Sequence, residues 1–313
     1  MATFRSRILD RMLRLLTARP IDPKADPAVM RNKINRLAKR FGRKVKDIDV
    51  RPFDLDGMPA EWLVPKGVKD STTETPVLLY LHGGGYILCS PDTHRPLIAT
   101  LAKKSGQRAL VIDYRLAPEH PFPAAIDDAL KAYRWLLAQG TPASSITVAG
   151  DSAGGGLTLA LLLSLRDAGE PMPAGAALLS PWTDLAMSGW SHITHAKRDP
   201  MLSVEAALLG ARHYLGPVSP TDPLASPLYA KLEGLPPLAI HVGGNEILLD
   251  DSLRLADRAR AAGIEVAVKV WPDLPHVFQA ASFLPEARQS LDELAEFLKS
   301  ATLSKAPVRQ AAD

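Results

Sequence analysis

The sequence has a single cysteine, Cys89, among its 313 residues, so no disulfide can form within the chain. It also lacks an uninterrupted apolar run of about 18 residues, the length that a membrane-spanning helix requires. The net charge is only +3 and no Lys/Arg-rich run occurs, which disfavours nucleic acid as a partner. We therefore expect a cytoplasmic protein without stable membrane insertion.

The N-terminal segment lacks the continuous apolar core of a signal peptide. Arginines and an aspartate interrupt residues 4–16, whose apolar residues fall instead near one face of a helix. A helix lying on a membrane surface is one interpretation of this pattern. A helix packed over an active site is the interpretation that we favour.

The G-x-G-x-x-G spacing of a dinucleotide-binding loop is also missing, although the chain contains glycine-rich segments. One of these, His82-Gly83-Gly84-Gly85, directly follows the apolar run 75–81, which is suited to an inner parallel strand. Ligands of open α/β sheets bind at the carboxyl ends of such strands. Glycines at that edge leave backbone N–H groups free to face a developing negative charge.

A second motif, Gly150-Asp151-Ser152-Ala153-Gly154, lies between an apolar run predicted as a strand and a helix rich in small residues. Small residues at this point allow the sharp turn that presents a serine at the end of a strand. Together the two motifs predict acyl transfer through Ser152 as a nucleophile.

Strands and helices alternate over most of the chain, which predicts an α/β fold with helices on both faces of a mostly parallel sheet. An antiparallel hairpin over 45–65 is expected at the sheet edge. The remaining strands are expected near 76–81, 108–113, 146–150, 175–180, 237–243 and 265–270, giving an eight-stranded sheet. The helices of this part are expected near 93–105, 123–139, 153–167, 249–262 and 283–299.

The alternation breaks between Pro181 and Pro236, a stretch with several prolines and a short helix near 203–214. Such a length exceeds a plain connection and predicts an inserted segment. We expect a catalytic domain over 46–300 with a cap insertion at about 183–222, which joins two N-terminal cap helices in residues 1–45. The polar tail 301–313 is predicted to be disordered.

A serine nucleophile needs a base, and in this arrangement the chain order is serine, acid, histidine. His276 follows the last predicted strand, so its loop can carry the imidazole over the sheet edge to Ser152. His241 lies inside a predicted strand and is interpreted as a core or edge residue. His192 and His195 lie in the insertion without other metal-ligand residues and are interpreted as surface residues.

The acid should follow the preceding strand, 237–244. Glu246 is the first carboxylate past that strand and is our candidate. Asp250 and Asp251 are the alternatives, although a charge at the start of the next helix explains them more simply.

As an ordered set, these segments resemble the hormone-sensitive-lipase-like (family IV) bacterial carboxylesterases, a group of α/β-hydrolases. The segments that carry the resemblance are His82–Tyr86, Asp113–His120, Phe122–Ala125, Gly150–Gly155, Ser180–Asp184 and Leu274–His276. The resemblance implies Ser152 as nucleophile and His276 as base, with His82 in a structural role. It also implies an oxyanion hole formed by two N–H groups within Gly83, Gly84 and Gly85 and by that of Ala153. One departure is Glu246-Ile247-Leu248, where the family has Asp-Pro-Leu.

The expected activity is hydrolysis of short- to medium-chain carboxylic esters through an acyl-enzyme, with no metal or cofactor. Residues expected to line the substrate pocket are Tyr86, Leu88, Trp182 and Leu209, although the aromatic ones could equally belong to the core. The alternatives are a lactone hydrolase, a non-catalytic small-molecule binding protein, and a lipase anchored to a membrane by its N-terminal helix. The resemblance also implies a homodimer formed near residues 264–299.

Overall fold

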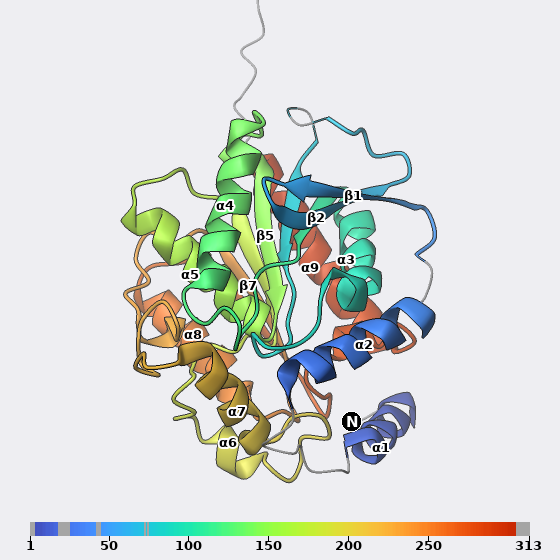
Figure 1. Ribbon diagram of the computed structural model, residues 1–313, viewed down its shortest axis with the longest axis vertical. Coiled ribbons are helices and arrows are strands. Elements are labelled where there is room, and N and C mark those ends of the chain that lie inside the picture. Colours follow the sequence, from blue (N-terminus) through green and yellow to red (C-terminus); the bar gives the residue numbers. More distant parts are fainter. Residues whose placement is uncertain (1–3, 18–25, 42–44, 72, 74, 305–313) are drawn as a thin grey trace, which may run out of the picture.

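The described part of the chain, residues 4–17, 26–41, 45–71, 73 and 75–304 of this computed structural model, contains one eight-stranded sheet (Figure 1). The strand order is β1-β2-β4-β3-β5-β6-β7-β8. Pairs β1–β2 and β2–β4 are antiparallel, and all other neighbours are parallel. The strands are β1 (Ile48–Leu55), β2 (Met58–Pro65), β3 (Val77–Leu81), β4 (Arg108–Ile112), β5 (Ile146–Asp151), β6 (Gly175–Leu179), β7 (Leu238–Gly243) and β8 (Val266–Trp271). The predicted sheet and its edge hairpin are confirmed.

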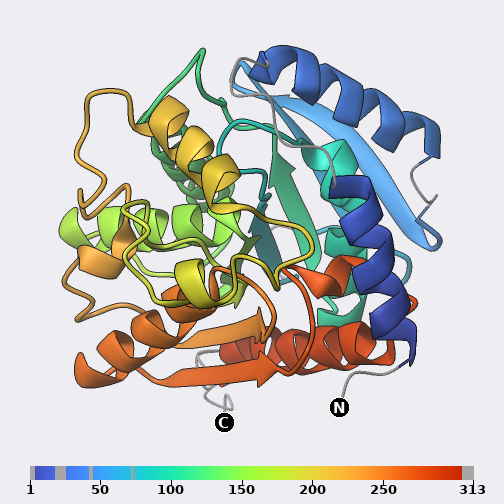
Figure 2. The ribbon, with the colours of Figure 1, turned by 90° about the horizontal axis from the view of Figure 1, so that it is seen from below.

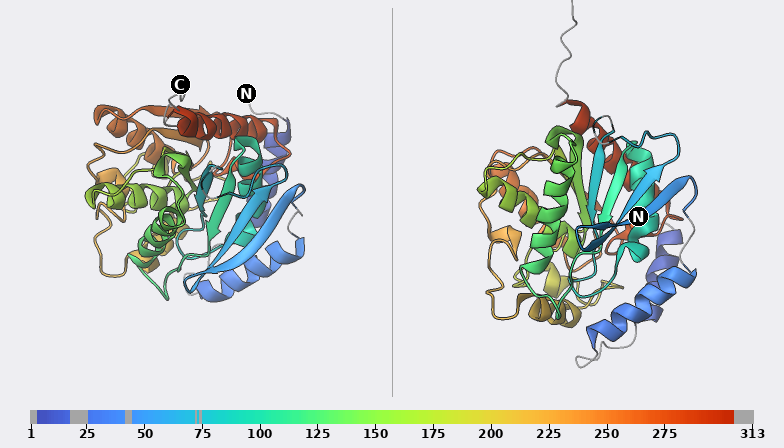
Figure 3. Two further views of the ribbon diagram at one scale, coloured as in Figure 1. Left: turned by 90° about the horizontal axis from the view of Figure 1, so that it is seen from above. Right: turned by 45° about the horizontal axis from the view of Figure 1, so that its top comes forward.

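Helices connect the parallel strands and cover both faces of the sheet, as predicted (Figure 3). The helices are α1 (Phe4–Thr17), α2 (Pro27–Phe41), α3 (Pro91–Ser105), α4 (Ala124–Ala138), α5 (Ala153–Asp167), α6 (Ser191–Thr194), α7 (Val204–Leu215), α8 (Leu249–Ala261) and α9 (Pro285–Ser304). Single 3₁₀ turns are η1 (Ala143–Ser145), η2 (Pro227–Tyr229) and η3 (Phe278–Ala280). No helix within the described ranges is long and apolar enough to cross a membrane.

The period-two pattern of the strands separates two layers of core. In β3, Leu78 and Tyr80 face the layer of α3 and α9, whereas Leu79 and Leu81 face the layer of α4, α5 and α8. All residues of β3 to β7 are buried, because helices cover both of their faces. The edge strands β1 and β8 are partly exposed, in keeping with their place in the strand order.

The irregular stretch predicted as an insertion connects β6 to β7 and contains α6 and α7. These two helices lie with α1 and α2 at one end of the molecule, below the sheet in Figure 1 and toward the viewer in Figure 2. Tyr214 of α7 stacks on Tyr86, just past the carboxyl end of β3, with ring centroids 3.7 Å apart. Leu9 of α1 is buried in a cluster with Trp271 and Phe278. Both contacts lie beyond the carboxyl ends of the strands, where a cap would lie.

The C-terminal helix is longer than predicted. It continues to Ser304, past the boundary at 301 from which a disordered tail was expected. The physical reason is packing: Ala301 lies against Gly175 at the start of β6, and Thr302 is buried. The rest of the predicted tail, 305–313, lies outside the described residues.

Candidate active site

Ser152 occupies the sharp turn between β5 and α5, and its backbone is strained. Its φ of 53° and ψ of −123° lie outside the regions that residues with a side chain normally adopt. Such a conformation costs about 1–3 kcal/mol and persists only where its surroundings hold it. Here the Ser152 N–H donates to the Leu179 carbonyl at 2.9 Å, and the Ser152 carbonyl accepts from the N–H groups of Gly155 and Trp182, both at 2.9 Å. These bonds hold the serine at the end of β5, as predicted.

The turn is packed so closely that two positions require glycine. A Cβ on Gly150 would overlap the Gly154 carbonyl, and a Cβ on Gly154 would overlap the Leu81 carbonyl. Both obstacles are backbone atoms, so no side-chain rotation could relieve the overlap. The two glycines therefore allow α5 to begin directly against β3 and β5.

Glu246 and His276 meet at the carboxyl ends of β7 and β8. The Glu246 Oε2 lies 3.3 Å from His276 Nδ1 and accepts a hydrogen bond of 2.9 Å from the Ser180 hydroxyl. Glu246 is fully buried and His276 is 3% exposed, so water is largely excluded from the pair. The structure thus brings the predicted acid to the predicted base. The alternative acids bind other groups: Asp250 accepts from the Ser191 N–H, and Asp251 accepts from the Thr183 N–H.

The loop that carries His276 and the turn that carries Ser152 are both hydrogen-bonded to the carboxyl end of β6. The Val277 N–H donates to Ser180 Oγ at 3.2 Å, and Ser180 directly follows the carbonyl of Leu179 that holds the Ser152 N–H. Within the described part of the chain, no hydrogen bond joins Ser152 Oγ to the imidazole. Catalytic hydrogen bonds of this kind often close only when substrate is bound.

The carboxylate of Glu246 controls the protonation of His276. Burial would lower the pKa of His276, but the Glu246 carboxylate, together with Asp199 and Asp151, raises the pKa above its ordinary value. Burial also raises the pKa of Glu246, against the opposing effects of His276 and of the Ser180 hydroxyl. The pair is therefore suited to take up a proton on the imidazole and to stabilise the resulting positive charge.

Two N–H groups of the glycine loop have no hydrogen-bond partner in the described structure. Gly84 and Gly85 have φ values of 122° and 62°, which favour glycine, and no hydrogen bond within the described residues uses their N–H groups. The N–H of Gly83 is already donated to Asp151 Oδ1 at 3.1 Å. Ala153 begins α5, so its N–H has no partner within the helix. Gly84, Gly85 and Ala153 are thus the available donors among the four expected residues.

Asp151 connects the serine motif to the glycine loop, a role that the sequence reasoning missed. Besides Gly83, its carboxylate accepts from the Tyr80 hydroxyl at 2.8 Å and lies 3.1 Å from His94 Nε2. Burial would raise the pKa of Asp151, but His94, Tyr80 and His82 together outweigh burial and the pKa is lowered. The only sequence signal was the position of Asp151 beside Ser152.

His82 fits the structural role that the resemblance implied. Its ring stacks on Tyr114 with centroids 4.3 Å apart, and its Nδ1 lies 2.8 Å from the Gly83 carbonyl. Burial lowers the pKa of His82 to about 3, so the ring stays neutral at physiological pH. The His82 ring therefore contacts both Tyr114 and the backbone of the glycine loop.

The four residues expected to line a substrate pocket divide into two pairs. Tyr86 and Trp182 are 2% and 3% exposed and belong to the core beneath the site. Leu88 and Leu209 are only partly buried. A Cβ on Gly210 would lie 3.2 Å from the Gly85 carbonyl, so α7 packs directly on the glycine loop.

The prediction that His192 lies on the surface is wrong. His192 is 4% exposed, and its Nε2 lies 3.3 Å from the Asp251 carboxylate. The base of the insertion folds against the start of α8, and the carboxylate offsets the cost of burying the imidazole. His195 is partly exposed. His241 is a buried strand residue, as predicted, with its Nδ1 2.8 Å from the Ser290 hydroxyl.

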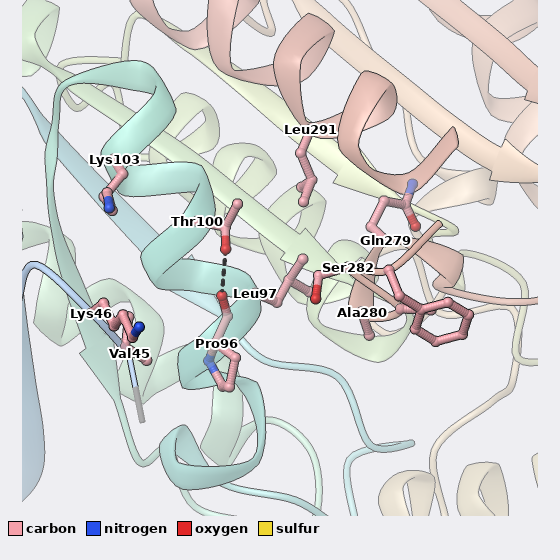
Figure 4. A pocket seen from close by; sticks show the side chains of 12 residues that line it. Val45, Lys46, Pro96, Leu97, Thr100, Lys103, Gln279, Ala280, Ser282 and Leu291 are labelled. Carbon is pink, nitrogen blue, oxygen red and sulfur yellow. Dashed lines mark hydrogen bonds between the residues drawn. The ribbon is translucent and has the colours of Figure 1, made fainter. Parts of the chain in front are cut away.

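A cavity of about 600 Å³ lies between α3, α9 and the segment that follows His276 (Figure 4). It is lined by Val45, Lys46, Pro96, Leu97, Thr100, Lys103, Gln279, Ala280, Ala281, Ser282, Phe283 and Leu291. Because the lining includes no residue of the serine turn, the glycine loop or the acid–base pair, this cavity is separate from the candidate active site.

Residues 78–280 match a family model described as the alpha/beta hydrolase fold. The chain is 46% identical over 272 residues to an acetyl-hydrolase of Streptomyces hygroscopicus, covering 86% of this chain and 88% of that protein. It is 38% identical over 279 residues to an esterase of Acinetobacter venetianus, covering 88% and 90% of the two chains.

Solved structures agree with these relatives. An esterase of the bacterial hormone-sensitive lipase family is 43% identical, with a TM-score of 0.89 over 96% of this chain and 100% of that one. The esterase EstE5, soaked with p-nitrophenyl butyrate, is 40% identical, with the same TM-score and coverage. The chain therefore belongs to the α/β-hydrolase fold family and to its bacterial hormone-sensitive-lipase group.

A first prediction concerns the charge of Glu246. If His276 must be neutral to act as a base, kcat/KM falls as the pH drops through its raised pKa, above the ordinary value of about 6.5. Glu246→Gln removes the charge, so the acid limb of the pH profile moves to lower pH and the plateau falls about 100- to 10,000-fold. Glu246→Asp is the matched control, because it keeps the charge and hence the acid limb. An unchanged pH profile of kcat/KM in Glu246→Gln would show that Glu246 is not part of the active site.

Proposed function

We propose that this chain is a serine carboxylesterase in which Ser152 is the nucleophile, His276 the general base and Glu246 the acid that orients it. The relatives named esterase and acetyl-hydrolase support the reaction class, which is carboxylic-ester hydrolysis. The single observation that best supports the residue roles is the buried contact of 3.3 Å between Glu246 and His276 at the strand edge that also holds the strained serine.

The proposed reaction has two halves. Ser152 Oγ attacks the ester carbonyl carbon while its proton passes to His276. The tetrahedral intermediate then expels the alcohol, which takes the proton from His276, and leaves the acyl group on Ser152. Water repeats the sequence through the same histidine, releasing the acid and restoring the serine.

The oxyanion of each tetrahedral intermediate would be held by the N–H groups of Gly84, Gly85 and Ala153. Their lack of partners in the described chain supports this assignment, because a donor already in use cannot serve the intermediate. Gly83 would act through its bond to Asp151, which fixes the first residue of the loop. Each donor of an oxyanion hole typically contributes about 3–4 kcal/mol to transition-state stabilisation.

We further propose that residues 1–45 and 183–222 form a cap over this site and limit it to short and medium acyl chains. Arg31 of α2 supports this, because its guanidinium donates to the Ile87 and Ala117 carbonyls at 3.1 and 2.9 Å and pairs with Glu119 at 3.0 Å. These contacts hold a helix of the cap against the segment that follows the glycine loop. Leu88 and Leu209 are the partly exposed candidates for contact with the acyl chain.

The second prediction tests the nucleophile and the chain length. With p-nitrophenyl esters from acetate to palmitate, the wild type should prefer the acetate-to-hexanoate range and hydrolyse palmitate poorly. Ser152→Ala should lower kcat at least about 10,000-fold, because no other group can form the acyl-enzyme. Ser164→Ala is the matched control, since in the described part of the chain that hydroxyl bonds only to the Ala160 carbonyl within α5. Retained turnover in Ser152→Ala would refute the proposed mechanism.

The third prediction tests the cap. Arg31→Ala should loosen α2 from the Ile87 carbonyl and raise KM about tenfold, equivalent to about 1.4 kcal/mol, with little change in kcat. Arg36→Ala is the control, because among the described residues the Arg36 guanidinium bonds only to the Asn32 carbonyl of its own helix. If the two variants bind short esters equally well, α2 does not contribute to the substrate site.

The cellular location and the oligomeric state of the protein are also proposals. We propose a cytoplasmic location, in keeping with the single cysteine, Cys89, which is unpaired. We propose a homodimer formed through β8 and α9, since β8 is a partly exposed edge strand. Sedimentation of the purified protein at micromolar concentration should give twice the chain mass of 33.8 kDa, and a monomer would contradict the proposal.

A further inference from the structure

Asp199 is a buried carboxylate of the insertion that reaches the loop of the proposed catalytic acid. The residue is 7% exposed, and its Oδ1 accepts the N–H groups of Met201 and Leu202 at 2.8 and 2.9 Å. Its Oδ2 points out of the insertion and accepts the Ile247 N–H at 2.9 Å. Ile247 is the residue directly after Glu246, so Asp199 bonds to the backbone that carries the acid.

The insertion also contacts the other side of Glu246. The Asn245 side-chain amide donates to the Arg198 carbonyl at 3.1 Å. The Ser191 hydroxyl donates to the Ile247 carbonyl at 2.6 Å. The residues on both sides of Glu246 are therefore held by the insertion, through bonds that span 47 to 56 positions of the sequence.

The position of the Glu246 carboxylate depends on these backbone contacts. Its Oε2 makes both side-chain contacts, whereas Oε1 has no hydrogen-bond partner in the described structure. A glutamate also has one more rotatable bond than the aspartate of the family pattern, so its carboxylate is less firmly fixed by its own side chain. The position of the carboxylate at His276 thus depends strongly on where the loop backbone is held.

Asp199 also contributes charge. The carboxylates that act on the His276 imidazole are Glu246 and Asp199, together with Asp151 from the serine motif, and each favours the protonated ring. Asp199 forms no ion pair with a described residue, and its hydrogen bonds all come from backbone N–H groups. Among the described residues, no cation therefore pairs with its carboxylate.

We propose that Asp199 is a positioning residue of the esterase site, which couples the insertion to catalysis by fixing the Ile247 backbone and hence the Glu246 carboxylate on His276. The inference rests on the proposed function, because it acts through the proposed acid and base. It assigns the insertion a part in the chemical step, in addition to any part in shaping the substrate pocket.

The test compares Asp199→Asn with wild type in the full chain, using p-nitrophenyl butyrate over a range of pH. The variant keeps the shape of the side chain but loses its charge and weakens its hold on Ile247. We expect kcat to fall about 10- to 100-fold with KM nearly unchanged, because the loss is of catalytic geometry. The acid limb of kcat/KM should move to lower pH, because a negative charge near His276 has been removed.

Asp222→Asn is the matched control. Asp222 also lies in the insertion and accepts the N–H groups two and three residues ahead, those of Leu224 and Ala225, at 2.9 and 3.2 Å. In the described structure it forms no hydrogen bond with the loop of Glu246, so its variant should keep the acid limb of wild type. If Asp199→Asn behaves like this control and loses only thermal stability, Asp199 merely anchors the insertion and the inference is wrong.

A double variant tests whether the effect of Asp199 on catalysis passes through Glu246. If Asp199 acts through Glu246, adding Asp199→Asn to Glu246→Gln should lower kcat by less than about twofold, whereas independent effects would multiply. NMR titration of His276 gives a readout that does not need turnover, and its pKa should fall in Asp199→Asn. Absence of ester hydrolysis by wild type would refute the proposed function. An unchanged His276 titration in Asp199→Asn would refute this inference alone.

Discussion

The strained backbone at Ser152 is the constraint on which the rest of the site depends. A φ of 53° on a serine is unfavourable. The conformation is held by hydrogen bonds to the Leu179 carbonyl of β6 and from the Gly155 N–H at the start of α5. The same requirement explains why Gly150 and Gly154 are glycines, since any larger residue would meet backbone atoms of neighbouring elements. The central strands are fully buried, and this rigid layer is what can hold such a turn.

Around this turn, the side chains of Asp151, Glu246 and His276 are almost entirely buried, and short contacts join them to specific partners. Glu246 lies 3.3 Å from His276, and Asp151 holds the glycine loop through the Gly83 N–H. In the absence of water these interactions are stronger, and they need little reorganisation during a reaction. Asp199 extends this polar network from the insertion to the loop of Glu246 through the Ile247 N–H.

The parts of this structure that were predictable from sequence depend on local patterns. Apolar runs and glycine motifs identified the parallel strands and the turn at Ser152, and the chain order serine, acid, histidine then placed Glu246 after β7 and His276 after β8. The prediction for His192 was wrong because its burial depends on contact with a helix about 60 residues away. The bonds of Asp151 and Asp199 were not predictable, because they join distant segments and leave no periodic or motif signal in the sequence.

The central claim is that a single activated serine forms a covalent acyl intermediate. The most direct test is reaction with an alkyl p-nitrophenyl phosphonate, followed by peptide mass spectrometry of the inactivated protein. We expect one adduct per chain, on the peptide that contains Ser152, with activity lost in proportion to the fraction modified. Complete inactivation with the adduct on another residue, or full modification of Ser152 with activity retained, would contradict it.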